Sequence, residues 1–237
     1  MVRRDAAGEP EEAEARRTAG RPPRLSRERA VEAAVAIVRK GGMEALTMRA
    51  LADALDATPM ALYRHVGDRD ELALLVVDRV MSGVKLPDRG VSARAFLRGL
   101  AREVRDAGRA HRGVMDLLLE EGPAVASTLV ILDAVVTKLH EEGATWKEAA
   151  ALHNTFFSWL AATVRREERW ATRGREKRPM MRRFLDAARA MPPSEYPGIA
   201  HVLPHMPGED VDQAFESSLS FMLDGIAVRL GKSGRSR

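Results

Sequence analysis

The chain has 237 residues, of which 45% are hydrophobic, and its formal net charge is +4. This length suits one large domain or two smaller ones, and the excess of basic residues is compatible with an anionic partner without requiring one. Because the chain has no cysteine, it cannot form disulfides or thiolate metal sites, and the cytoplasm is its expected location.

The two ends of the sequence lack the apolar periodicity of a folded element. Residues 1–20 are rich in Ala, Gly, Glu and Arg, and residues 231–237 read GKSGRSR, so both are expected to be disordered tails. The N-terminal segment has no apolar stretch of the kind found in signal peptides. No segment approaches the roughly 20 apolar residues of a membrane span, so no membrane association is expected.

Residues 21–86 are expected to form a small domain of short helices. Apolar residues at helical spacing predict a first helix, with Ser26 as its N-cap and Gly41-Gly42 as its end. Later in this segment, Asp68 is followed three residues on by Glu71, which is typical of a capping box. The helix that it opens is predicted to reach about Ser82.

Between these helices, two short ones predicted over 47–55 and 58–65 have the pattern of a helix-turn-helix. Ala52 is small enough for the helices to cross closely, and Asp56 occupies the turn, where positive φ is needed. The residues expected to face the core are Leu51, Leu55 and Leu62. The second helix is too short to be stable alone, so its outer face is available for another molecule. In that case Met60, Ala61 and Arg64 enter a major groove of DNA, and Tyr63 and His65 reach the phosphates beside it.

Residues 87–230 carry longer helical patterns and predict a larger helical domain. Helices are expected over 92–111, 114–120, 123–139, 145–165, 179–190 and 209–230. Pro123 suits the first position of the third of these, in which Leu129, Leu132, Val136 and Leu139 share a face. Thr145 and Glu148 predict another capping box.

Two segments of this larger domain are expected to lack regular structure. Residues 165–183 contain nine Arg or Lys against three Glu, and we interpret them as a solvated loop, the alternative being a second nucleic-acid surface. Five prolines make residues 191–208 mostly irregular. His201 and His205 have the spacing of metal ligands, but with Pro204 between them and no acidic ligand near, they are expected to be surface residues.

The run from Arg24 through Met81, with ALTMRALADALDATPMALYRHVGDRDELALL at its centre, resembles the DNA-binding domain of the tetracycline-repressor family. Its characteristic parts are a helix ending in Gly-Gly, Leu-Thr-x-Arg-x-Leu-Ala, Leu-Tyr-x-His-Val and then an acidic cap. Residues 215–227, FESSLSFMLDGIA, look like the last dimerisation helix of the tetracycline-repressor branch. The resemblance implies an all-α fold: an N-terminal three-helix helix-turn-helix domain and a larger C-terminal ligand-binding and dimerisation domain.

The resemblance also implies operator DNA as a partner, and it assigns contacts residue by residue. Phosphate contacts are implied for Thr47, Tyr63, His65 and Arg69. Met60 stands where many members have Pro, and Gly67 where Lys is common, so one phosphate contact is in doubt. Pro59 and Ala61 offer no hydrogen bonds to bases, so base recognition is expected from Arg49, Thr58 and Arg64, although Arg49 can equally contact a phosphate.

The basic residues Arg21 and Arg24 precede the first helix and have two interpretations. They either enter a minor groove as an arm or belong to a solvated linker. The sequence alone does not decide between these alternatives.

A small-molecule effector is the second implied partner. Tetracycline repressors hold a magnesium-drug chelate partly through histidines, and here Leu118 and Phe157 fall at two such positions, with Arg165-Arg166 where an acidic partner would lie. Because these residues supply no metal ligands, we expect a metal-free pocket for a flat, mostly apolar or aromatic effector, and no cofactor. Its apolar lining is expected from Phe96, Met115, Leu118, Leu119, Phe156, Phe157 and Trp159, with His111, His153 and Asn154 as polar anchors. The aromatic residues of 156–159 could equally lie in the core or in a dimer interface.

The last helix carries an apolar stripe, Phe215, Leu219, Met222 and Ile226, which predicts a homodimer interface. The sequence has none of the common nucleophile, phosphate-loop, dinucleotide or zinc-protease motifs, so no enzymatic activity is expected. The favoured function is a homodimeric repressor released from its operator by an effector. An activator with the same DNA-binding mode and a regulator acting through protein partners are the alternatives.

Overall fold

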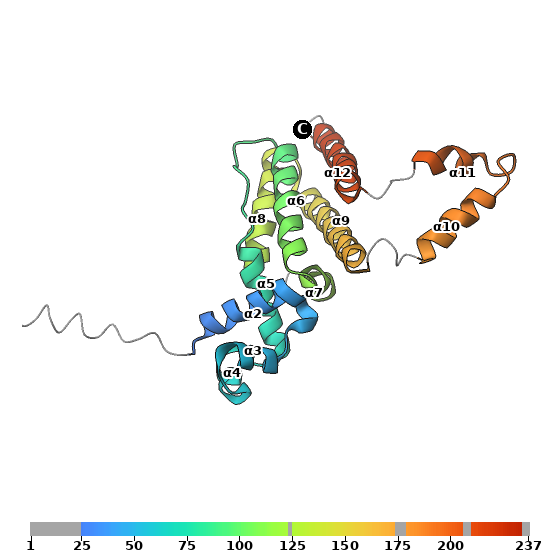
Figure 1. Cartoon of the computed structure of the whole chain (residues 1–237). Helices are drawn as coiled ribbons and strands as arrows, with labels where there is room; N and C mark the ends of the chain where they lie inside the picture. The colour runs from blue at the N-terminus through green and yellow to red at the C-terminus, as the bar shows by residue number, and fades with distance from the viewer. Residues whose placement is uncertain (1–24, 123–124, 174–178, 206–209, 234–237) are drawn as a thin grey trace, which may run out of the picture.

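The computed structural model describes residues 25–122, 125–173, 179–205 and 210–233, and every regular element in these ranges is helical. Short helices α2 to α4 lie at the lower end of Figure 1, and the longer helices α6, α8, α9 and α12 lie above them. The all-α prediction is therefore confirmed. Residues 1–20 lie outside the described ranges, whereas residues 231–233, predicted as part of a tail, extend the last helix.

Helix α2 (Arg27–Gly41) begins and ends where the sequence predicts. The Ser26 hydroxyl accepts a hydrogen bond from the Arg29 amide at 3.2 Å, and Gly42 ends the helix with a φ of 77°. Ala30, Ala34 and Val38 form its buried face. A short 3-10 turn, Met43–Ala45, leads into the next helix.

Helices α3 (Met48–Leu55) and α4 (Pro59–Val66) form the predicted helix-turn-helix. Thr47 and Thr58 cap them, each accepting a hydrogen bond from the amide three residues on, at 3.0 and 3.3 Å. Asp56, between them, adopts the left-handed conformation with φ 49° and ψ 49°, as the turn requires. Ala52 and Leu62 are buried where the two helices pack.

Helix α5 (Arg69–Ser82) connects this unit to the rest of the chain. The predicted cap Asp68 accepts hydrogen bonds from the amides of Asp70 and Glu71, both at 2.9 Å. The helix packs against α2 in the N-terminal unit and against α8 in the C-terminal one, so it belongs to the cores of both.

The C-terminal part is a bundle built around one long helix. Helix α9 (Trp146–Arg173) contacts α6 (Ala93–Ala110), α7 (Val114–Glu121), α8 (Ala126–Glu141) and α12 (Val211–Ser233). Its N-terminus has the predicted reciprocal capping box, in which Glu148 accepts from the Thr145 amide at 3.0 Å and Thr145 accepts from the Glu148 amide at 3.2 Å.

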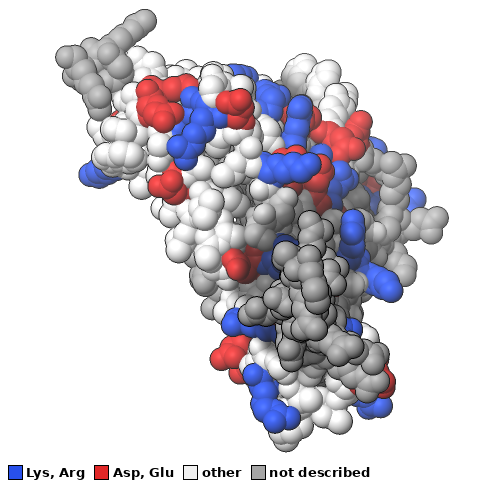
Figure 2. All heavy atoms as spheres, turned by 90° about the vertical axis from the view of Figure 1, so that its left-hand side faces the viewer, with Lys and Arg blue, Asp and Glu red and all other residues white. Residues whose placement is uncertain are grey.

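Charged side chains fix α12 against α6. Arginines at intervals of three or four on α6 face acidic residues at intervals of four or eight on α12; the pairs are Arg94–Asp224, Arg98–Glu216, Arg102–Glu216, Arg105–Asp212 and Arg109–Asp212. Arg105 is buried, bonds Glu167 of α9 at 2.9 Å, and lies 4.1 Å from the centre of the Phe215 ring. Arg102 holds the pKa of the Glu216 carboxyl below its ordinary value by bonding it. In Figure 2 the upper part of the visible face shows basic and acidic side chains lying side by side.

Helix α8 differs from the prediction in two ways: it begins later, and a different side of it is buried. It begins at Ala126, and Pro123, its predicted first residue, lies outside the described ranges. Leu129, predicted on the apolar face, is 54% exposed, whereas Ile131 and Val135 are buried. The helix is apolar on more than one side, and packing against α5 and α9 selects the side that periodicity alone left ambiguous.

The basic segment 165–183 is largely helical, so its interpretation as a loop was wrong. Residues up to 173 continue α9, residues 174–178 lie outside the described ranges, and α10 (Pro179–Ala190) begins where predicted. Arg165 pairs with Asp116 of α7, and Glu167 with Arg105 of α6, so neighbouring helices neutralise part of this charged stretch.

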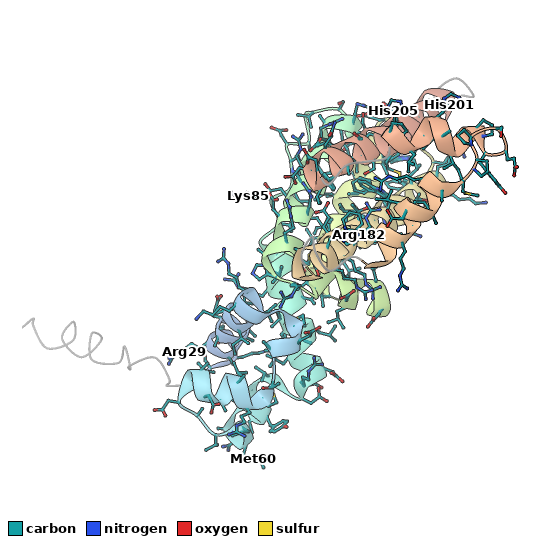
Figure 3. All side chains as sticks on the ribbon, turned by 45° about the vertical axis from the view of Figure 1, so that its right-hand side comes forward. Arg29, Met60, Lys85, Arg182, His201 and His205 are labelled. Carbon is teal, nitrogen blue, oxygen red and sulfur yellow. The ribbon has the colours of Figure 1, made fainter. Side chains whose placement is uncertain are left out.

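Beyond α10, the proline-rich stretch is also more regular than predicted. It contains α11 (Pro197–Val202) and a 3-10 turn, Leu203–His205. The α10 and α11 pair extends away from the bundle in Figure 1. His201 and His205 are exposed, as expected, and both are labelled on this extension in Figure 3.

The apolar stripe predicted to join two subunits is mostly inside one chain. Phe215, Leu219 and Ile226 are buried against the chain's own bundle, and Met222 is half-buried. Phe215, Leu219 and Ile226 therefore cannot supply the surface that a second copy would contact, so the prediction is wrong for these three residues and stays a prediction for Met222. The sequence shows that α12 has an apolar stripe, but the stripe is matched by the chain's own α6 and α9.

Candidate DNA-binding surface and effector pocket

Helix α4 presents one side to solvent at the end of the molecule farthest from the C-terminal bundle. Met60 is 73% exposed and Tyr63 is 48% exposed, and Arg64 and His65 beside them are exposed too. Leu62 on the opposite side is fully buried, which fixes the rotation of the helix. Figure 3 shows Met60 at the lower tip of the molecule. A narrow convex helix with this exposed side matches the width of a DNA major groove.

Groups that are able to bind a phosphate lie beside this helix. The Thr47 hydroxyl accepts from the Ala50 amide at 3.0 Å, which leaves its hydrogen available to donate to a phosphate oxygen. The N-terminus of α3 adds unpaired amides and the positive end of the helix dipole. Arg49 is exposed in the first turn of the same helix.

The remaining predicted DNA contacts have mixed outcomes. Thr58 and Pro59 are exposed at the start of α4, and Ala61 is half-buried. Arg69 pairs with Asp70 at 3.2 Å, but both side chains are more than half exposed, so the pair is weak and a phosphate can replace it. Arg21 and Arg24 lie outside the described residues.

Helices α5 to α9 enclose a cavity of about 260 Å³. Six residues predicted to bind an effector meet there: Met115, Leu118, Leu119, His153, Asn154 and Phe157. The other described lining residues are Met81, Val104, Gly122, Thr128, Ile131, Ser158 and Ala161. The cavity is therefore mainly apolar, with four polar side chains among the described residues.

The polar side chains of this pocket are uncharged. His153 is buried, and burial lowers its pKa, although a hydrogen bond to Asn154 opposes this shift. The His153 Nδ1 lies 3.3 Å from the Asn154 Oδ1, and its ring centre lies 4.6 Å from that of Phe157. With Thr128 and Ser158 as further hydrogen-bonding groups, the site suits a neutral apolar body with a few polar atoms.

Four residues predicted for the pocket lie elsewhere. Phe96 and Phe156 are buried in the core, and Trp159 stacks on Phe215 with ring centres 5.9 Å apart. The reason is rotation along α9: residues 156 and 159 face the core and α12, whereas residue 157 faces the pocket. His111 has its Nδ1 2.9 Å from the Ala107 carbonyl oxygen and lines a separate groove beside α2 and α5.

Two protein-family models match most of the sequence. The model of bacterial regulatory proteins of the tetR family matches residues 30–76, and that of the tetracyclin repressor-like C-terminal domain matches residues 86–230. The chain belongs to the tetracycline-repressor family. It is therefore a transcriptional regulator with a helix-turn-helix DNA-binding domain.

Curated relatives of the family align over most of their length. The chain is 29% identical over 226 residues to the HTH-type transcriptional repressor DrrR1 of Streptomyces coeruleorubidus, covering 88% of this chain and 80% of that one. It is 27% identical over 215 residues to the class D tetracycline repressor protein of Escherichia coli, covering 87% and 91%.

Solved structures of the family share the fold. Apo ActR from Streptomyces coelicolor matches with a TM-score of 0.78 and 24% identity, over 92% of this chain and 100% of that one. ActR in complex with actinorhodin matches with a TM-score of 0.74 and 25% identity, over 87% and 97%. Homologues of this regulator thus bind small molecules. Within the described residues, no helix has the length and apolarity needed to cross a membrane.

The N-terminal unit of this regulator and its C-terminal bundle meet at two turns. The Met43 amide donates to the Arg112 carbonyl oxygen at 2.8 Å, and the Arg112 guanidinium donates to the Gly41 carbonyl oxygen at 2.7 Å. Gly113 has a φ of +91°, and a Cβ added there would lie 2.9 Å from the Met43 Cβ. Glycine is therefore required at 113 both by its backbone and by the close approach of the two units.

Glu168 of α9 is hydrogen-bonded to the turn at this junction. Its Oε2 accepts a hydrogen bond from the Gly113 amide at 3.0 Å, and the side chain is buried. Burial, reinforced by nearby Asp116, raises the pKa of Glu168 to about 7. Because α9 also lines the pocket through His153 and Phe157, one rigid helix connects the pocket to the turn that touches the DNA-binding unit.

Sequence reasoning missed Gly113, Glu168 and the small residues of the pocket. Gly113 stands in a recognisable His-Arg-Gly break between two helices, and that break is a signal for positive φ. Glu168 lies in a run of charged residues, where nothing local distinguishes a buried carboxylate from a solvated one. Ser158 and Ala161 become pocket residues only through the packing of α9 beside α7 and α8.

Proposed function

We propose that this regulator is a homodimeric repressor that leaves its operator when an apolar or aromatic effector enters the pocket between α5 and α9. The observation that carries the proposal is a recognition helix and an apolar pocket in one chain, connected through α9, Glu168 and the Gly113 turn. The name of the relative DrrR1 as a repressor and the actinorhodin complex of ActR support it. A protein that binds chromosomal DNA works in the cytoplasm.

The dimer is proposed to form through the outer face of α12. Phe221 and Val228, seven residues apart on one side of this helix, are 77% and 56% exposed. Gly225 lies between them, and a Cβ built there meets nothing within 4 Å, so a second helix could approach closely. We infer that α12 and α9 pair with their mates as a four-helix bundle. That dimer would place two α4 helices in successive major grooves, about 34 Å apart.

On DNA, the proposed roles divide between affinity and sequence recognition. Phosphates are contacted by Thr47, Tyr63, His65 and Arg69. Bases are read by Arg49, Thr58 and Arg64, with Met60, Pro59 and Ala61 in apolar contact. Each of these residues except Ala61 is exposed on the same end of the molecule.

In the pocket, the effector is proposed to bind without metal. Most groups that surround it are thioether, aliphatic and aromatic side chains, and the described lining includes no carboxylate, the ligand that hard cations prefer. His153 and Asn154 orient its polar atoms, and Phe157 packs against its ring system. The effector weakens DNA binding only to the extent that it prefers the conformation unfit for the operator.

The DNA-binding part of the proposal is tested with an operator selected from a random pool of duplexes. Anisotropy of a labelled operator gives the affinity at several salt concentrations. Because Arg49, Arg64 and Arg69 of each subunit are cations proposed to lie against the DNA, their binding releases counterions, and log Kd should rise with log salt with a slope of several units. Binding that does not respond to salt would contradict the phosphate assignments.

Two other functions fit the same family. An activator would bind the same operator and raise transcription from a reporter promoter in vitro, whereas a repressor lowers it. A regulator acting through protein partners would bind no duplex from the selected pool. The exposed residues Tyr63, Arg64 and His65 of α4 favour DNA over a protein partner. They lie near two helix N-termini capped by threonine, and both kinds of group suit an anionic partner.

A further inference from the structure

A second hollow lies next to the effector pocket. It is a groove of about 300 Å³ lined by Leu119, Ala162, Arg165, Arg166, Arg169 and Trp170. Leu119 lines both this groove and the pocket, so the two hollows adjoin at that side chain. A ligand in the mainly apolar pocket therefore lies beside a groove that is lined by basic side chains.

Helix α9 carries both sites along one side. Asn154 and Ser158 line the pocket, and Ala162, Arg166 and Arg169 follow at intervals of three or four residues. Residues spaced in this way lie above one another on a helix, and the eight residues from 158 to 166 rise about 12 Å. The distance suits a chain of a few atoms that leaves the pocket past Leu119.

The charges of the two sites differ. None of the described residues that line the pocket carries a charge when His153 is neutral, whereas the groove is lined by three arginines. Arg165 is paired with Asp116, and Glu168 of the same turn faces the Gly113 amide. Arg166 and Arg169 are exposed, and the Arg166 guanidinium lies 5.1 Å from the centre of the Trp170 ring. An arginine held against a ring is well placed to bind a carboxylate.

We propose that the effectors of this regulator are amphipathic anions, with a neutral ring system in the pocket and an acidic group on a short arm bound by Arg166 and Arg169. The inference rests on the proposed function, since it assigns the chemical class of that same ligand. An uncharged ring system of equal shape is held by the pocket alone and binds more weakly.

The matched probes 1-pyrenebutanoic acid and 1-pyrenebutanol test this assignment, because they share the ring and the arm and differ in the charge. Pyrene fluorescence gives their affinities for the full-length protein and for three variants. Arg166→Gln with Arg169→Gln should weaken the acid about fivefold or more and leave the alcohol unchanged, and added salt should act on the acid alone. Arg182→Gln with Arg183→Gln, a double change of exposed residues on α10, is the matched control and should change neither.

Ala161→Trp separates this inference from the proposed function. The indole would fill the pocket, so both probes should lose binding while circular dichroism reports an intact fold. If the double arginine variant weakens both probes equally or neither, the anion assignment is overturned and the pocket stands. If Ala161→Trp leaves the binding of both probes unchanged, or if neither binds the native protein, the pocket itself is contradicted and the inference is overturned with it.

Discussion

Substitutions of neighbouring side chains on α4 are expected to change DNA binding in different ways, because these side chains are proposed to contact different parts of the DNA. The Tyr63 hydroxyl is proposed to bind a phosphate, which is the same in every sequence. Tyr63→Phe should therefore weaken binding to all duplexes alike, by about 1 kcal/mol or roughly fivefold. Anisotropy with the selected operator and with a scrambled duplex measures both. A loss confined to the operator would show that Tyr63 reads bases instead.

Arg64 is expected to give the opposite pattern. An arginine that bonds a base edge contributes about 1 to 3 kcal/mol of discrimination, so Arg64→Ala should narrow the gap between operator and scrambled duplex. The ratio of the two Kd values is the measurement. Arg27→Ala, an exposed change in α2, is a control for the loss of one positive charge. Equal weakening on both duplexes would make Arg64 a phosphate contact.

The buried carboxyl of Glu168 predicts a pH dependence of stability. Its pKa is about 7 in the folded chain and near 4.5 when unfolded, so the folded state takes up a proton between these values. The free energy of unfolding should accordingly fall as pH rises from about 4.5 through 7, by about 3 kcal/mol at most from this group. Glu168→Gln keeps an acceptor for the Gly113 amide and removes the ionisation.

Urea unfolding between pH 5 and 8.5 measures this contribution. The Glu168→Gln profile should be flatter than the native one, and the variant should be the more stable protein at the alkaline end. Glu120→Gln, an exposed change on α7, serves as the control. Parallel profiles for Glu168→Gln and the native chain would mean that the carboxyl is not held in its neutral form.

At the scale of helices, α12 has a buried apolar side that packs in its own chain and exposed apolar residues that are proposed to meet a second copy. Leu219→Glu would place a charge in the core, and its cost of about 3 kcal/mol or more should unfold or strongly destabilise the chain. Phe221→Glu changes an exposed residue, so the fold should survive while the proposed dimer dissociates. Light scattering and thermal unfolding distinguish the two outcomes. A folded Phe221→Glu dimer would move the subunit interface to another surface.

Local signals made the N-terminal helices predictable, and long-range packing limited the prediction elsewhere. Ser26, Thr47 and Asp68 act within three residues of themselves, so their capping roles are readable from the sequence. Which side of α12 meets its own chain depends on partners more than 100 residues away, such as Arg98 for Glu216. An apolar stripe in a sequence does not show whether it faces the core or another subunit. For the same reason, the sequence did not show that Phe156 and Trp159 face the core and not the pocket.

At the scale of the whole molecule, the candidate DNA-binding surface and the candidate effector pocket lie in different parts of one chain. The helices around α4 carry the candidate DNA surface, the bundle around α9 holds the pocket, and the two parts are joined by the shared core of α5 and by the turns at Met43 and Arg112. We propose that a change in the tilt of α9 would reach Met43 through Glu168 and the turn at Gly113, because hydrogen bonds join these residues in sequence. In a dimer, a small rotation at each junction changes the separation of the two α4 helices, and operator binding depends on that separation.

Release of the operator by an effector is the most direct test of the proposed function. The measurement is anisotropy of the labelled operator with the full-length protein while planar apolar and aromatic compounds are added, once with magnesium and once with EDTA. We predict release by some of these compounds to the same extent in both buffers, and no release from the Ala161→Trp variant, whose pocket is filled. Release that requires magnesium, or release that persists undiminished in Ala161→Trp, would contradict a metal-free effector in this pocket.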